Sequence, residues 1–189
     1  MSALDSLPTA SLDLTSPDPT ADGGQPSLML SSFSIASQEQ NEWCWSAVAL
    51  AITSFYGIGT GTTQCQLASS VLNLATCCDT PGGCNSTAEL QTALAKAGVA
   101  TYVYAAPLGA PDITNQLQHQ RPIGVRIVWG TTNSAHFISV FGIYDTGDQG
   151  IWVDVGDPDP AVGLGSTSLA ALTSNYRSAG GFLSHYYLT

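Results

Sequence analysis

The first half of the chain carries apolar residues at the spacing of helices. The segment from Cys44 to Ile52 is apolar nearly all round and follows Asn41, a favoured N-cap residue, which predicts a buried helix. Gly57 is placed to end this helix. Three shorter helices are expected: residues 64–73, a segment opened by the capping box Ser86-Thr87-Ala88-Glu89 with Leu90, Leu94 and Ala97 on one face, and a segment from Pro111-Asp112 to just before Arg121-Pro122.

The second half of the chain changes to the pattern of strands. Segments rich in Val, Ile, Tyr and Phe predict strands over residues 99–104, 123–129, 136–144, 151–155 and 182–188. A turn cluster over 145–150 joins two of them as an antiparallel hairpin. Helices followed by a sheet predict an α+β domain.

Residues 1–27 differ from the rest, because they are rich in Ser, Thr, Pro, Asp and Gly and lack apolar periodicity. They predict a flexible leader or linker ahead of one domain over 28–189. The leader has neither a basic start nor an apolar core, so a standard secretory signal is not expected. Its Gly23-Gly24 pair is either a processing or hinge point or plain linker.

Charge and length narrow the classes of function. The 189 residues suit a single domain, and 4 basic against 14 acidic residues give a net charge of −10. Such a chain has no basic surface for nucleic acid or an anionic membrane, so neither partner is expected. No apolar run approaches the ~20 residues that cross a bilayer, and no membrane insertion is expected.

Cys65, Cys77, Cys78 and Cys84 form a cluster in the sequence. Their spacing lacks the short Cys-x-x-Cys pairs of most zinc sites. Disulfides, which are typical of exported proteins, are therefore favoured over a metal site. Which of the four cysteines pair is left open.

Cys44 stands apart from this cluster, near the start of the buried helix. A thiol in the first turn of a helix lies at the positive end of the helix dipole, which favours the nucleophilic thiolate. Gln38 precedes it by six residues. An amide there could stabilise an oxyanion together with the backbone N–H of Cys44. Cys44 is therefore a candidate nucleophile and Gln38 a candidate oxyanion donor.

A nucleophilic cysteine needs a base, which is ordinarily histidine. His136 begins a strand directly after a loop, where site residues are often presented, whereas His119 lies in a polar stretch and His185 in the terminal strand. In the predicted hairpin, His136 faces the end of the next strand. Asp157 is therefore the best candidate to orient the imidazole, and Asp159 is the next.

At these residues the sequence resembles the papain-like cysteine peptidases, and more narrowly the bacterial AvrRpt2-type and C39-like group. The pattern Asn41-Glu42-Trp43-Cys44-Trp45-Ser46-Ala47 matches theirs, with Gln38 before it, His136 leading an apolar strand and Asp157 before a proline. The similarity extends to Gln64-Cys65, Cys77-Cys78 and Cys84-Asn85 and covers roughly residues 33–189.

The resemblance implies a helical half carrying Cys44, packed on an antiparallel β half that carries His136 and Asp157, with the site between them. Cys44 would attack a peptide carbonyl and form a thioester, while His136 would transfer protons. Asp157 would hold the imidazole, and Gln38 would donate to the oxyanion. No metal or organic cofactor is needed, the substrate is a protein or peptide, and a monomer is expected.

The same fold and triad also serve acyl transfer, so a transglutaminase-like acyltransferase or deamidase is the nearest alternative. An inactive papain-like binding module is another. The leader is a candidate pro-segment, or a substrate cut near Gly23-Gly24. The resemblance and the clustered cysteines favour an exported effector, secreted or host-delivered by a non-standard route; the alternative location is the cytoplasm.

Overall fold

The computed structural model describes residues 27–105, 107–130, 132 and 134–189. All but the last residue of the expected leader, including Gly23-Gly24, lies outside these described residues. The helices are α1 (Cys44–Phe55), α2 (Gln64–Leu72), α3 (Leu90–Lys96), α4 (Ala110–Gln118) and α5 (Leu169–Ser174), with a 3₁₀ turn over Pro81–Cys84. The strands are β1 (Leu28–Met29), β2 (Tyr102–Tyr104), β3 (Ile123–Trp129), β4 (Ala135–Asp145), β5 (Ile151–Asp157), β6 (Gly163–Ser168) and β7 (Gly181–Leu188).

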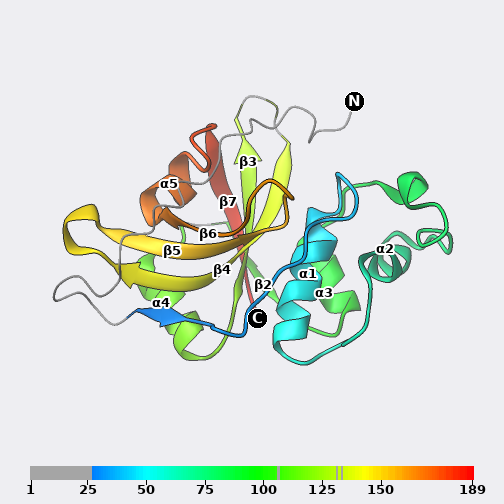
Figure 1. Ribbon diagram of the computed structural model, residues 1–189, viewed down its shortest axis with the longest axis horizontal. Coiled ribbons are helices and arrows are strands. Elements are labelled where there is room, and N and C mark those ends of the chain that lie inside the picture. The colour runs from blue at the N-terminus through cyan, green and yellow to red at the C-terminus, as the bar shows by residue number, and fades with distance from the viewer. Residues whose placement is uncertain (1–26, 106, 131, 133) are drawn as a thin grey trace.

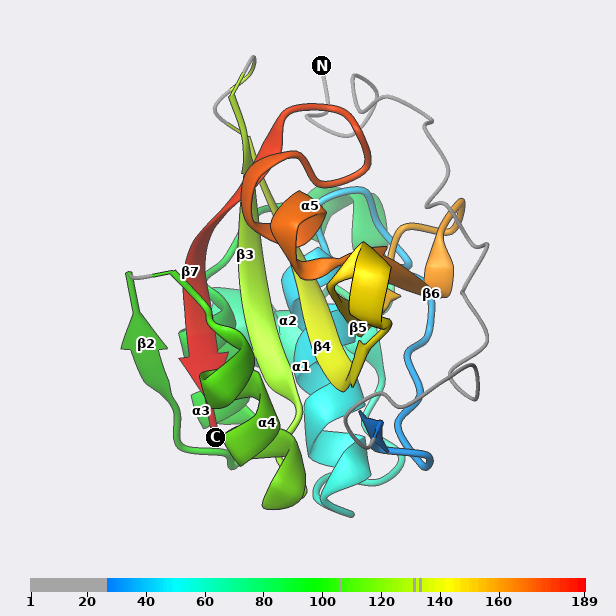
Figure 2. The same ribbon diagram turned by 90° about the vertical axis from the view of Figure 1, so that its left-hand side faces the viewer.

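The strands form one antiparallel sheet in the order β2-β7-β3-β4-β5-β6, with β1 paired to β4. Helices α1 to α3 gather on one side of this sheet, and α4 and α5 lie on the other (Figures 1 and 2). The α+β prediction is therefore confirmed: a helical half packs against an antiparallel β half.

The helix α1 is the buried centre of the helical half. Cys44 through Ala49 are all buried along it, as expected from a segment that is apolar on every side. Gly57, with a φ of +70°, follows its C-terminus as predicted. The predicted N-cap is wrong, because Trp43 occupies that position without a side-chain cap and Asn41 lies outside the helix.

The capping-box prediction for α3 is also wrong. The helix begins at Leu90 with Glu89 at its N-cap, and no side chain caps it. Ser86 instead lies before the helix, where its carbonyl oxygen accepts a hydrogen bond of 3.1 Å from the indole N–H of Trp45. Ser86 thus makes a tertiary contact with α1 and does not cap α3 as its local sequence pattern predicted.

Three elements were not predicted: β1, β6 and α5. The segment of β6, Gly-Leu-Gly-Ser-Thr-Ser, contains little of the β-branched and aromatic content that marks strands. Pairing with β5 over Trp152 to Asp157 makes it a strand. The strand β1 and the helix α5 are too short to show a periodic pattern of apolar residues in the sequence.

The hairpin of β4 and β5 forms as predicted. Ser139 pairs with Gly156, and the register shifts between Val140 and Gly142. At Gly142 a side chain would overlap the carboxylate of Asp154, so the two strands approach closely there. This register brings the first residues of β4 beside the last residues of β5.

The four clustered cysteines pair as Cys65–Cys78 and Cys77–Cys84. The first disulfide ties the start of α2 to the loop that leads into α3, and the second closes that loop on itself. Within the described part of the chain, no helix is long and apolar enough to span a bilayer.

Candidate active site

Cys44 is the first residue of α1 and the free cysteine among the described residues. Two fully buried tryptophans flank it and hold the helix start in place. The indole of Trp43 donates to the carbonyl oxygen of Cys84 at 2.8 Å, and that of Trp45 donates to Ser86. The whole residue Cys44 is 6% exposed and is therefore buried.

His136 and Asp157 meet across the β4–β5 hairpin, as the sequence predicted. The Nε2 atom of His136 lies 2.6 Å from Oδ1 of Asp157, and both side chains are fully buried. The other ring nitrogen, Nδ1, is buried without a well-formed hydrogen bond. The Cys44 thiol lies close enough to the ring to affect its charge. The imidazole therefore stands between the thiol and the carboxylate.

This arrangement favours a protonated imidazole. Burial lowers the pKa of His136, but the charge and hydrogen bond of Asp157, followed by the interaction with Cys44, outweigh it and raise the pKa to about 10. Burial raises the pKa of Asp157, but His136 and its other partners reverse this and hold it below its usual value. An anionic carboxylate and a cationic ring stabilise each other.

Asp157 has further partners that sequence reasoning missed. The hydroxyl of Tyr176 donates to Oδ2 of Asp157 at 2.9 Å, and the backbone N–H of Asp159 donates to Oδ1 at 2.9 Å. The guanidinium of Arg177 lies 4.0 Å from Oδ2. Tyr176 is fully buried, and burial, followed by the Asp157 charge, raises its pKa well above the usual value, so its hydroxyl remains a donor.

The other carboxylates of the hairpin and the other histidines occupy different places. Asp159 binds Arg177 at 2.7 Å instead of the imidazole. Asp154 pairs with Gly142 and accepts from Ser166, farther along the hairpin. His119 follows α4 on the surface, and His185 lies on β7 opposite Arg126. The structure thus brings Asp157 to His136 and leaves Asp159 beside it as the partner of Arg177.

Gln38 lies in the segment that leads to α1, and its main chain joins the two halves. Its backbone N–H donates to the carbonyl oxygen of Pro158 at 2.8 Å, directly after Asp157. Its side-chain Nε2 donates to the carbonyl oxygens of Gln40 and Asn41 at 3.1 and 2.8 Å. The amide is therefore near the loop before Cys44, with its N–H groups turned to that loop.

A family model for the papain-like cysteine protease AvrRpt2 matches residues 31–177. The matched region contains Gln38, Cys44, His136 and Asp157. The chain belongs to this family. It is a papain-like cysteine peptidase, as the sequence motifs predicted.

A solved structure agrees with this assignment at the level of the fold. The peptidase domain of Streptococcus ComA, a bifunctional ABC transporter involved in a quorum-sensing pathway, matches with a TM-score of 0.54 and 18% identity, over 82% of this chain and 96% of that chain. The Pseudomonas avirulence protein AvrPphB matches with a TM-score of 0.35 and 14% identity, over 84% of this chain and 97% of that chain. No curated protein is significantly similar in sequence.

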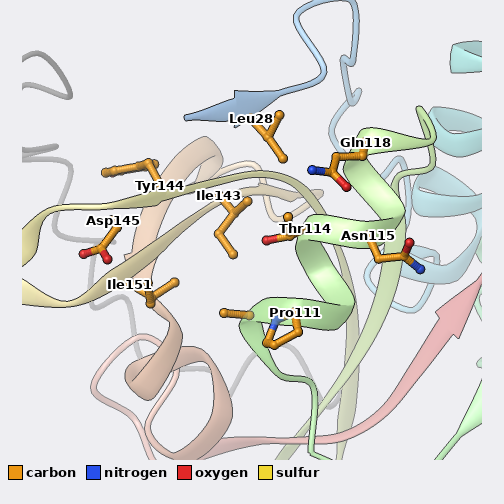
Figure 3. Close-up of a pocket in the computed structure, with 10 residues that line it drawn as sticks. Leu28, Pro111, Thr114, Asn115, Gln118, Ile143, Tyr144, Asp145 and Ile151 are labelled. Atoms are coloured by element: carbon orange, nitrogen blue, oxygen red, sulfur yellow. The ribbon is translucent and has the colours of Figure 1, made fainter. Parts of the chain in front are cut away.

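The peptidase also has a cavity of about 460 Å³ away from these residues (Figure 3). It lies between α4 and the far end of β4, where Thr114 and Gln118 face Leu28 and Ile143. None of its lining residues belongs to the Cys44–His136–Asp157 group. The cavity is therefore separate from the Cys44–His136–Asp157 group.

Proposed function

We propose that the peptidase cleaves peptide bonds with Cys44 as nucleophile, His136 as general acid and base, and Asp157 as the residue that orients the imidazole. The observation that carries the proposal is the buried 2.6 Å contact between His136 and Asp157. It occupies Nε2, which leaves Nδ1 as the ring nitrogen for the thiol. Cys44, at the start of α1, provides that thiol.

The reaction follows from these positions. In the resting site the proton of the Cys44 thiol lies on Nδ1 of His136, which makes the ring cationic, and the thiolate attacks the carbonyl carbon to form a tetrahedral oxyanion. The oxyanion collapses to a thioester as the C–N bond breaks, and the leaving amine takes the proton from Nδ1. Water then attacks the thioester, giving its proton to Nδ1. The second oxyanion collapses, the acid product leaves, and the thiolate is restored beside the protonated His136.

The oxyanion needs donors beside the thiol. The backbone N–H of Cys44 is one of the first in α1, and such groups have no partner within their own helix. The Gln38 amide is the second donor in our proposal. Its Nε2 donates to the carbonyl oxygens of Gln40 and Asn41. To act as a donor in the reaction, the amide must therefore exchange one of these hydrogen bonds for one with the oxyanion.

The catalytic unit that we propose spans residues 28–189, and its substrate is a protein or peptide. The two disulfides support the idea that the enzyme functions in an oxidising compartment, because such bonds are rare in cytosolic proteins. We therefore propose export, with residues 1–27 as a leader that the enzyme itself is able to trim. Comparing the mass of wild type with that of Cys44→Ala tests this: trimming of both to one length excludes self-cleavage.

The triad is tested by intact-mass kinetics of iodoacetamide labelling near neutral pH, followed by digestion of casein. We expect rapid single labelling of wild type, none at this site in Cys44→Ala, and slow labelling in His136→Ala and Asp157→Asn. The matched controls are His185→Ala and Asp154→Asn, which alter the same residue types elsewhere on the sheet. Equal labelling rates for wild type and His136→Ala would refute the proposed Cys–His pair.

A further inference from the structure

Gln64 is a buried polar residue with no place in the reaction described above. It opens α2, and only 4% of it is exposed. Its Oε1 accepts the backbone N–H of Glu39 at 3.0 Å, and its Nε2 donates to the carbonyl oxygen of Ser37 at 2.8 Å. One amide thus holds the main chain on both sides of Gln38.

The three contacts of this segment fix its direction. In extended backbone, the carbonyl of one residue and the N–H two residues later point to the same side, and the residue between them points to the other. Ser37 and Glu39 face Gln64, while the N–H of Gln38 faces Pro158 of the β half. With both edges of the backbone held, the direction in which the Gln38 side chain leaves it is set.

Gln64 is itself firmly held. The residue before it, Thr63, forms a reciprocal capping box with Gln66, which fixes the first turn of α2. The carbonyl oxygen of Gln64 accepts a hydrogen bond of 3.2 Å from the hydroxyl of Ser46 on α1. The next residue, Cys65, is bonded to Cys78. The amide therefore has a rigid base from which to position Gln38.

We propose that Gln64 is a positioning residue that holds Gln38 where its amide reaches the oxyanion. The inference rests on the proposed role of Gln38 as a donor. Gln64 acts through the main chain of Gln38 and takes no part in proton transfer between Cys44 and His136. Its loss should therefore slow steps that form an oxyanion and spare steps that need only the thiolate.

Two probes separate these steps. Iodoacetamide alkylates Cys44 at a saturated carbon, so no oxyanion forms, whereas p-nitrophenyl acetate acylates Cys44 through a tetrahedral oxyanion. The variant is Gln64→Met, which keeps the length of the side chain. Its matched control is Gln116→Met, which alters a buried glutamine of α4 that makes no contact with the segment of Gln38 or with α2.

We expect Gln64→Met to lower the acylation rate by roughly tenfold to a hundredfold, since small misplacements of catalytic donors cost this much. Its alkylation rate should stay within about twofold of wild type, as should both rates of Gln116→Met. In a Gln38→Ala background, Gln64→Met should add little, because it acts through the residue already removed.

An equal fall in both rates, or a full additional loss in the Gln38→Ala background, would overturn the positioning role. If Gln64→Met does not fold, Gln64→Glu replaces it: the carboxylate keeps the acceptor for Glu39 and loses the donor for Ser37, and the same selective loss of acylation is expected. If Gln38→Ala acylates as fast as wild type, the oxyanion assignment of Gln38 fails, and this inference fails with it. The triad itself would survive that result, because alkylation tests it separately.

Discussion

Removing the hydroxyl of Tyr176 should weaken the charge pair at the site without removing either of its members. The hydroxyl donates to Oδ2 of Asp157 at 2.9 Å, and the ring lies against Trp129 with centroids 6.3 Å apart. Tyr176→Phe keeps the ring in its buried position and deletes only the donor. A hydrogen bond to a charged group contributes about 1.5–3 kcal/mol, or roughly one to two factors of ten in an equilibrium constant.

The deletion should shift the pKa values of Asp157 and His136, each in a defined direction. Without the hydroxyl, the pKa of Asp157 rises, and the less firmly held carboxylate supports the His136 cation less well. The pKa of His136 should therefore fall from its raised value. In the rate of Cys44 alkylation against pH, the limb that reports on the imidazolium should move toward lower pH, while the protein remains folded.

Urea unfolding gives the second measurement. At pH 7 the variant should lose about 1.5–3 kcal/mol of unfolding free energy. A lowered Asp157 pKa contributes stability above the unfolded pKa of about 4, and this is lost as pH falls through the folded pKa. The difference between wild type and Tyr176→Phe should therefore narrow below about pH 4.

The control is Tyr187→Phe, which alters a buried tyrosine whose ring contacts Phe137 on the same sheet. It should leave the pH profile of alkylation unchanged. The reasoning about Tyr176 is refuted if Tyr176→Phe alkylates with the same pH profile as wild type, even if its stability falls.

Stability and backbone geometry give three further tests. Burial lowers the pKa of His136 but its partners raise it to about 10, so its contribution is complete below the unfolded pKa of about 6.5 and is lost as pH rises toward 10. With the opposite loss from Asp157 in acid, urea titrations should show greatest stability between about pH 4 and 6.5, and a rise above pH 7 would contradict this. Trp43→Phe leaves a buried carbonyl without its donor and should cost about 1–3 kcal/mol in urea unfolding; no loss would show that the bond contributes nothing. Gly142→Ala should overlap the facing carboxylate on β5, lower the melting temperature and slow alkylation, whereas wild-type alkylation would show that the hairpin register tolerates the change.

The sequence predicts the triad candidates because they depend on local structure. A helix start places Cys44, and a hairpin places His136 opposite Asp157 by counting along two neighbouring strands. The orientation of the Gln38 amide depends on the turn after it, which no periodic pattern describes. The spacing of four cysteines likewise allows three pairings, and only the fold selects one.

The contacts of Tyr176 and Gln64 could not be predicted from the sequence for a different reason. Tyr176 reaches Asp157 from 19 positions away, after the unpredicted strand β6 and helix α5. Gln64 reaches Glu39 across 25 positions from another helix. Such contacts arise when elements pack together, so neither residue carries a local signal. Gln64 was visible only as part of the family-like Gln64-Cys65 pair.

The long strand β4 has a practical consequence for the search for inhibitors. His136 is near the start of this strand, while Tyr144 near its other end lines the 460 Å³ cavity. At ~3.4 Å per residue, these two residues lie roughly 25–30 Å apart along the strand. A compound selected because it fills the cavity would not contact the thiol. Under the proposed function, extended peptides that carry an electrophile suit Cys44 better, and the cavity is a separate place to attach a reporter.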